Sequence, residues 1–285
     1  INTVLVSTPN DTHCALACAA MKAGKNVIVE KPVAMDGAQA ELMARTAQQC
    51  GVIFTVHQNR RWDKDYKIAS QIVNDGMVGK VYSVQSRLHG SRGAMFGWRA
   101  EPEHGGGMIF DWGVHFTDQI MNLFGFDSIK SVFCKMVNVK TEDVEDYFFL
   151  VYDLKNGMHV QMEIGTWVLN PLPRWMILGD LGTAYINDFS RNGKIIKIEK
   201  SAEHSEAVVT GEGTPTRTFA PRPADEVMTF ELPDTPTDLR EYYANLRDAI
   251  EGKCEPIVKP CQVCAVMHVL DCAFESVRTG KQVMI

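Results

Sequence analysis

The sequence lacks the features that would place the protein in a membrane or among nucleic acid-binding proteins. No apolar run reaches the roughly 18–20 residues that a membrane-spanning helix needs. Lys and Arg do not cluster, no basic stretch is interleaved with aromatic residues, and the net charge is −6, so nothing indicates nucleic acid as a partner. The 285 residues, 45% hydrophobic and 22% charged, are instead typical of a soluble globular protein with a substantial core.

The eight cysteines do not indicate a disulfide or metal framework. Most of them lie in apolar, helix-like segments. Cys261 and Cys264 have the spacing of redox or zinc sites, but no second pair and no nearby His completes a four-ligand set. Because free Cys usually packs as a small hydrophobe, we expect no bound metal. Reduced thiols are typical of a cytoplasmic protein.

The first 58 residues alternate between short apolar runs and helix-like segments. The expected strands are 4–8, 27–29 and 52–56, and the expected helices are 13–23 and 36–50. Strands that alternate with helices form βαβ units with a parallel sheet. Residues 1–58 are therefore predicted to be a partial Rossmann-type, dinucleotide-binding domain.

A different pattern follows, and it predicts an α+β domain over residues 59–285. Helices are expected at 66–75, 108–124, 238–251 and 261–279, a strand at 81–88, and repeated strands from 129 to about 199. Turn signals such as Asn156-Gly157 join these strands into a large open, mainly antiparallel sheet. Residues 201–236, polar and rich in Gly, Pro and Thr, are expected to be exposed loops or a loose hairpin. The fold class is α/β.

Polar residues follow two neighbouring strands of the predicted parallel sheet. Ser7-Thr8-Pro9-Asn10 follows the first strand, and Glu30-Lys31-Pro32 follows the second. Ligands of such sheets bind at the carboxyl ends of the strands. A Lys at a strand end is usually only a solvated charge, but here it stands beside a carboxylate and a rigid turn where a ligand is expected.

A second informative segment covers residues 104–119. Three consecutive glycines, 105–107, permit a ligand to approach the backbone closely. Asp111 and His115 are four residues apart, so both should project from one face of a helix, and Asp118 lies one turn further, where it could orient either. With a lysine they would form a proton-handling set. The pair could also be a simple surface pair or two metal ligands, although no third ligand has a coherent spacing.

Taken together and in this order, these segments resemble the Gfo/Idh/MocA family, named after glucose–fructose oxidoreductase, inositol dehydrogenase and rhizopine catabolism. The resemblance covers the first 125 residues. The matching motifs are Thr8-Pro9 with His13, Ala23-Gly24-Lys25-Asn26-Val27 before Glu30-Lys31-Pro32, Asn59-Arg60-Arg61-Trp62, Trp98-Arg99, and Asp111-x-Gly113-x-His115-x-x-Asp118.

The resemblance implies an NAD(P)-dependent oxidoreductase that transfers hydride between nicotinamide and a sugar, cyclitol or related polyol. Carried over, Lys31 would stabilise the substrate alkoxide, and His115 would be the general acid/base. Asp111 would bind substrate and orient the site. The bond before Pro32 would be cis.

Further roles are implied by the same resemblance. The expected cofactor contacts are Ser7, Thr8, Pro9, Asn10, His13, Glu30, Lys31, Pro32, Asn59, Trp98 and Arg99. Arg60 and Trp62 would either touch the site or brace the domain junction, and Trp167, Arg174 and Trp175 would shape the sugar pocket or a subunit interface. A homodimer or homotetramer through the half-apolar open sheet is expected.

The sequence departs from the family at its start. The family begins with a glycine-rich turn that holds the cofactor pyrophosphate at a helix N-terminus, and no such motif precedes Glu30. We expect about 60–70 further residues, about two βα units, upstream of Ile1. The residue that separates NAD from NADP would lie there, so either cofactor remains open. Without this segment the chain is not expected to turn over substrate.

Two other functions use the same residues. One is an NAD-dependent glycosidase, which would cleave a chromogenic glycoside without added cofactor. The other is a non-catalytic nucleotide- or sugar-binding protein. The presence of Lys31, Asp111 and His115 together argues against the second.

Overall fold

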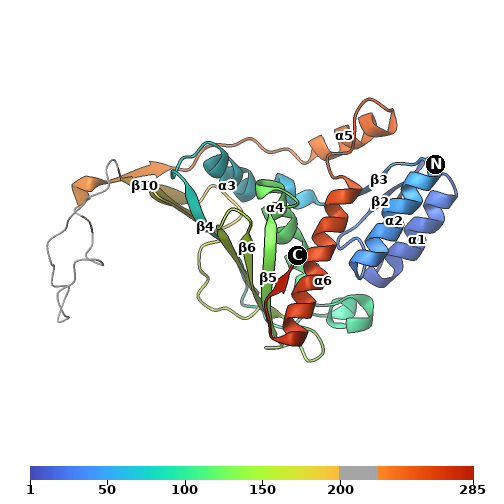
Figure 1. Cartoon of the computed structure of the whole chain (residues 1–285), viewed down its shortest axis with the longest axis horizontal. Coiled ribbons are helices and arrows are strands. Elements are labelled where there is room, and N and C mark those ends of the chain that lie inside the picture. The colour runs from blue at the N-terminus through green and yellow to red at the C-terminus, as the bar shows by residue number, and fades with distance from the viewer. Residues whose placement is uncertain (199–221, 223) are drawn as a thin grey trace.

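The computed structural model describes residues 1–198, 222 and 224–285. It contains a parallel sheet of three strands and a mixed sheet of nine strands, with helix α6 between them (Figure 1). The first part consists of β1 (Thr3–Val6), α1 (His13–Lys22), β2 (Asn26–Val29), α2 (Gly37–Cys50) and β3 (Phe54–Val56). The second consists of α3 (Lys64–Asn74), β4 (Val81–His89), α4 (Val114–Phe124), β5 (Ile129–Val137), β6 (Tyr147–Leu154), β7 (His159–Gly165), β8 (Trp175–Gly179), β9 (Gly182–Ile186), β10 (Gly193–Ile198), β11 (Val227–Glu231), α5 (Arg240–Ile250), α6 (Pro260–Thr279) and β12 (Val283–Met284).

The small sheet confirms the expected βαβ pattern. Its order is β1-β2-β3, all parallel, with Val4 opposite Val27 and Val27 opposite Phe54. Its central strand is a run of buried β-branched residues, as a sheet covered on both faces requires. Asp36 caps α2 by accepting a hydrogen bond from the Gln39 N–H at 2.8 Å. Gly51 ends the helix with φ +64°, a conformation that favours glycine.

The large sheet has the order β11-β10-β9-β8-β4-β7-β6-β5-β12. Its neighbouring strands are antiparallel except for β4 and β7, so the predicted mainly antiparallel sheet is confirmed. Along β6, buried and half-buried residues alternate, which leaves one face of the sheet towards the helices and the other open. Helix α3 packs against β8 and α6 against β5, and α4 reaches β6 through the Thr117–Tyr152 hydrogen bond of 2.8 Å.

Two expectations are corrected. Residues 108–124 are not one α-helix, because a π-helical turn, Ile109–Gly113, precedes α4. Residues 201–236, expected to be exposed loops or a loose hairpin, contain β11, whose antiparallel pairing with β10 excludes a loop throughout and fits the hairpin, while 201–221 and 223 lie outside the described residues. The proposed division after residue 58 stays a prediction. Helix α6 contacts both α2 and β5 and so joins the two parts.

Candidate active site

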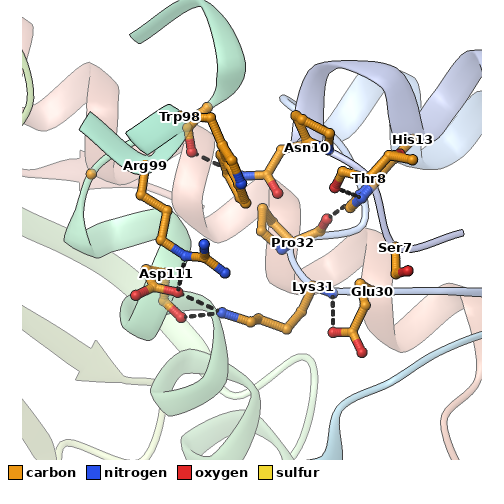
Figure 2. A pocket seen from close by; sticks show the side chains of 13 residues that line it. Ser7, Thr8, Asn10, His13, Glu30, Lys31, Pro32, Trp98, Arg99 and Asp111 are labelled. Atoms are coloured by element: carbon orange, nitrogen blue, oxygen red, sulfur yellow. Dashed lines mark hydrogen bonds and ion pairs between the residues drawn. The ribbon is translucent and has the colours of Figure 1, made fainter. Parts of the chain in front are cut away.

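A cavity of about 360 Å³ lies where β1 and β2 end and the second part of the chain crosses over them (Figure 2). All the predicted cofactor contacts except Asn59 line it, together with Asp111. The lining residues are Ser7, Thr8, Pro9, Asn10, His13, Glu30, Lys31, Pro32, Trp98, Arg99, Gly105, Gly107 and Asp111. The carboxyl ends of the parallel strands therefore form one wall of a cleft, as the sequence predicted.

Lys31 and Asp111 meet across this cleft (Figure 2). The Lys31 ammonium donates to the Asp111 carboxylate at 2.8 Å and to the Asp111 backbone carbonyl at 2.7 Å. Arg99 lies further away, with its Nε 3.7 Å from the same carboxylate oxygen. Burial lowers the pKa of Lys31, and although Asp111 opposes this effect, the pKa stays below that of an ordinary lysine. The peptide bond between Lys31 and Pro32 is cis.

The loop after β1 is tied to both sides of the cleft. The His13 imidazole, fully buried, lies 2.9 Å from the Thr8 carbonyl oxygen and 2.9 Å from that of Pro32. Asn10 reaches across, and its amide donates to the Gly105 carbonyl at 2.8 Å. These hydrogen bonds therefore fix the two walls of the cleft relative to each other.

The three glycines pack closely against other segments of the chain, so the approach of a ligand is not the only reason for glycine at these positions. A Cβ on Gly106 would lie 2.4 Å from the Arg99 carbonyl oxygen. A Cβ on Gly107, whose φ is +104°, would lie 2.5 Å from the Glu145 carboxylate. Gly105 and Gly107 still line the cavity. The glycines allow neighbouring segments to pack against the start of the helix that carries Asp111.

His115 does not line the cavity. It is buried, and its Nδ1 lies 3.2 Å from the Gln58 side-chain oxygen. Because that oxygen can only accept, Nδ1 carries the proton and the neutral ring keeps its lone pair on Nε2. Burial, followed by the positive charge of Lys31, lowers the pKa of His115 well below 6.5. The π-helical turn contains Asp111, so the expected 3.6-residue spacing to His115 does not hold.

Two residues that follow β3 were missed by the sequence analysis. Gln58 orients His115, and His57 Nδ1 lies 2.8 Å from Glu30, which lines the cavity. Tyr243 of α5 in turn lies 3.1 Å from His57 Nε2. Burial disfavours the Glu30 anion, but His57 and Lys31 together outweigh burial and leave the pKa of Glu30 below its usual value. Their only sequence signal is their place after the third strand.

Several residues that the sequence analysis singled out make packing or hydrogen-bond contacts inside the protein. The Arg60 guanidinium stacks 4.0 Å above the Trp112 ring, and the buried Trp62 donates to Glu241 at 2.9 Å; these contacts lie within residues 59–285, and a bracing role at the junction stays a prediction. Arg174 and Trp175 lie in the interior beside Asp65 and do not line this cavity. Trp167 remains partly exposed, with Lys140 above its ring.

Asp118 contacts neither Asp111 nor His115, contrary to expectation. Its carboxylate accepts two hydrogen bonds from Arg61, both at 2.7 Å, in a pair whose side chains are 1% and 4% exposed. Arg61 also donates to the Ile257 carbonyl and to Gln262. The pair therefore holds α4 to the segment after β3 and to the start of α6.

Glu145 accepts hydrogen bonds from the residues at the start of the π-helical turn. Its carboxylate accepts the Ile109 N–H at 2.9 Å, and its carbonyl accepts the Met108 N–H at 3.0 Å. Burial raises the pKa of Glu145 to about 7, although the Ile109 N–H favours the charged form. Folding therefore favours the protonated Glu145 carboxyl group. Because of this group, the free energy of unfolding decreases as the pH rises from about 4.5 to about 7.

Replacing Glu145 by glutamine is expected to raise the free energy of unfolding at pH 8 by about 2–3 kcal/mol, since each tenfold change in a protonation equilibrium is worth about 1.4 kcal/mol. Glutamine keeps an oxygen for the Ile109 N–H without a buried charge. Urea unfolding at pH 4.5 and pH 8 measures the effect, and the two proteins should converge at the lower pH. Glu142→Gln, exposed in the same loop, is the control. Equal stability at both pH values would contradict the prediction.

Within the described residues, no helix is long and apolar enough to cross a bilayer. The same residues contain no group of three or more His, Cys, Asp or Glu side chains that could hold a metal ion.

Comparisons with known proteins match the chain over its whole length. A sequence profile described as an oxidoreductase family with an NAD-binding Rossmann fold matches residues 1–58. The profile of the GFO/IDH/MocA C-terminal domain matches residues 66–185. A crystal structure of an NAD-binding protein from Listeria innocua is 34% identical with a TM-score of 0.95, over 100% of this chain and 82% of that one.

Two curated relatives extend these matches. The uncharacterized oxidoreductase YdgJ of Escherichia coli (strain K12) is 28% identical over 98% of this chain and 79% of its own length. The scyllo-inositol 2-dehydrogenase (NADP(+)) IolW of Bacillus subtilis (strain 168) is 31% identical over 54% of this chain and 43% of its own.

Proposed function

Since the chain belongs to the Gfo/Idh/MocA family of oxidoreductases with an NAD-binding Rossmann fold, we propose that it oxidises a CH–OH group of a sugar, cyclitol or related polyol, or catalyses the reverse reduction. The observation that carries this proposal is the Lys31–Asp111 contact at a cavity over the carboxyl ends of β1 and β2. The name of the Bacillus subtilis relative, an inositol dehydrogenase, supports a polyol substrate.

The cavity residues fit the nicotinamide and ribose end of NAD or NADP. Hydroxyl groups of Ser7 and Thr8, the Asn10 amide and the Glu30 carboxylate offer partners for ribose hydroxyls and a carboxamide. A Cβ on Gly105 would come within 2.7 Å of the Met35 sulfur, so the cavity wall is backbone at this point. When bound, the nicotinamide ring would accept or supply the hydride.

The chain's own residues would handle charge and protons. The Lys31 ammonium would donate to the reacting oxygen and stabilise the negative charge that develops there. Asp111, now paired with Lys31, would exchange that partner for a substrate hydroxyl. His115 would take the hydroxyl proton at Nε2, since its Nδ1–H is held by Gln58 and its lowered pKa keeps the ring neutral.

The test of this assignment is His115→Asn, which is expected to lower kcat for polyol oxidation by about 10²–10³-fold. Initial rates of nicotinamide reduction over a panel of sugars and cyclitols measure the loss. His268→Asn, an exposed histidine of α6, is the matched control. Unchanged turnover in His115→Asn would show that another group is the base. If no panel member is oxidised by the full-length protein with either cofactor, the proposed function falls.

We also propose a cytoplasmic location and a homo-oligomer formed through the open face of the large sheet. All eight cysteines are free thiols, which suits a reducing compartment. On the open face, the half-buried Phe133, Phe149 and Val151 lie on adjacent strands, opposite in orientation to the buried Cys134 and Leu150. A second copy that covered them would remove apolar surface from water.

A further inference from the structure

A second cavity, of about 660 Å³, adjoins the first and shares Arg99 and Asp111 with it. Asp111, a proposed catalytic residue, therefore stands at the junction of two spaces. The first is formed by the strand ends that fit a nicotinamide. The second is formed by the loop after β4, the end of β7 and the π-helical turn. A substrate that contacts Asp111 extends into this second cavity.

The second cavity is too large for a single sugar ring. Its volume of about 660 Å³ corresponds to room for about twenty non-hydrogen atoms if each takes about the 30 Å³ of a liquid water molecule. A hexose ring with its hydroxyl groups has about half as many. The cavity is instead within the range of about 300–1,000 Å³ that holds drug-sized ligands. A substrate that fills this cavity therefore carries more than a sugar ring.

Much of the lining of the second cavity is apolar. The apolar side chains that line the cavity are Leu88, Met95, Phe96, Met108, Trp112 and Ile164. Phe96 is 84% exposed, which is unusual for a side chain that projects from a cavity wall. Carbohydrate hydroxyls gain little from such a surface, whereas an aromatic or alkyl group is removed from water by it.

Two polar side chains, His89 and Thr166, also line the second cavity. Among the described residues, His89 Nε2 and Thr166 Oγ1 are buried without a hydrogen-bond partner. His89 Nδ1 accepts the Leu172 N–H at 3.2 Å, so in the neutral ring the proton lies on Nε2. Nε2 faces the Glu163 carboxylate at 3.7 Å, and His89 lowers the pKa of Glu163, so the Thr166 hydroxyl is the polar group left for a ligand. Buried polar atoms usually find a partner, and an oxygen of a glycoside would provide one for the Thr166 hydroxyl.

We propose that the substrate is a glycoside with an apolar substituent, and that this substituent packs against Phe96 and Trp112 while the sugar ring contacts Asp111. The inference rests on the proposed function, because it assumes that a sugar reacts at Asp111. The substrate is the molecule expected in the second cavity, because the apolar side chains and the Asp111 carboxylate line the same space.

The test compares matched phenyl and methyl pyranosides of glucose, galactose and mannose. Equilibrium binding is measured by calorimetry, with and without NAD or NADP, for the unaltered protein, for Phe96→Ala, and for Leu169→Ala. Leu169 is a matched control because it is 72% exposed on a neighbouring loop and does not line the cavity. Oxidation of the same compounds is followed separately.

For at least one sugar, the phenyl glycoside should bind about tenfold or more tightly than its methyl partner, a difference of about 1.4 kcal/mol. Phe96→Ala should reduce that preference several-fold and Leu169→Ala should not. No preference for any phenyl glycoside overturns the inference. The inference is also overturned if Phe96→Ala changes the size of the oligomer and leaves the preference for the phenyl glycoside intact. That result would show that the surface around Phe96 binds a second copy of the chain. A preference without oxidation supports the substituent site and contradicts the proposed function; oxidation without a preference does the reverse.

Discussion

Replacing Lys31 by methionine is expected to lower kcat/KM for polyol oxidation by about 10³-fold, the loss that follows removal of a preorganised donor to a developing oxyanion. Methionine keeps a similar unbranched stem, so the cavity retains its shape. What disappears is the ammonium that lies 2.8 Å from Asp111 at the junction of the two cavities. Arg99, 3.7 Å from the same oxygen, is poorly placed to replace it. Steady-state rates measure the change, and calorimetry should find cofactor affinity altered only a few-fold.

The control for this variant is Lys64→Met, which removes an ion pair between Lys64 of α3 and Asp234, neither of which lines the cleft. Its rates should equal those of the unaltered protein. The pH dependence provides an independent check. Because the pKa of Lys31 lies below that of an ordinary lysine, activity should decline on the alkaline side as the ammonium loses its proton. Lys31→Arg should move that decline to higher pH, since a guanidinium stays charged. A Lys31→Met enzyme with normal rates would exclude the proposed role.

The parts of the site that sequence predicted are those set by local pattern. A short buried run followed by Ser7-Thr8-Pro9-Asn10, and another followed by Glu30-Lys31-Pro32, predicts two parallel strands and a ligand at their carboxyl ends. Each signal lies within a few residues, and adjacent parallel strands bring the two endings together. The cavity over β1 and β2 is the result.

The parts that sequence missed depend on contacts between distant residues. Gln58 orients His115 across 57 positions of the chain, and the Glu145 carboxylate reaches the Ile109 N–H across 36. The π-helical turn at 109–113 is invisible to a helical-spacing argument because that argument assumes 3.6 residues in every turn. The contact between Gly107 and Glu145 was likewise not predicted, because Glu145 comes from the distant loop before β6.

Asp118 is the clearest case of a residue whose motif indicated the wrong role, and its actual role makes a strong prediction. Replacing Asp118 by asparagine is expected to lower the free energy of unfolding by about 3–5 kcal/mol, because it leaves the Arg61 charge buried without its partner. Burial opposes the charge on Arg61, yet the Asp118 carboxylate outweighs it and raises the pKa of Arg61 above its usual value. Urea unfolding at neutral pH measures the loss.

Asp63→Asn is the matched control for this ion pair. Asp63 accepts from Arg60 at 2.8 Å, but the two side chains are 21% and 28% exposed, so its loss should cost about 1 kcal/mol or less. The double variant Arg61→Leu with Asp118→Leu should recover part of the Asp118→Asn loss, since no buried charge remains. Recovery would be incomplete because the Ile257 carbonyl and Gln262 lose their donor. Equal costs for Asp118→Asn and Asp63→Asn would mean that α4 is held to the end of β3 by packing and not by this ion pair.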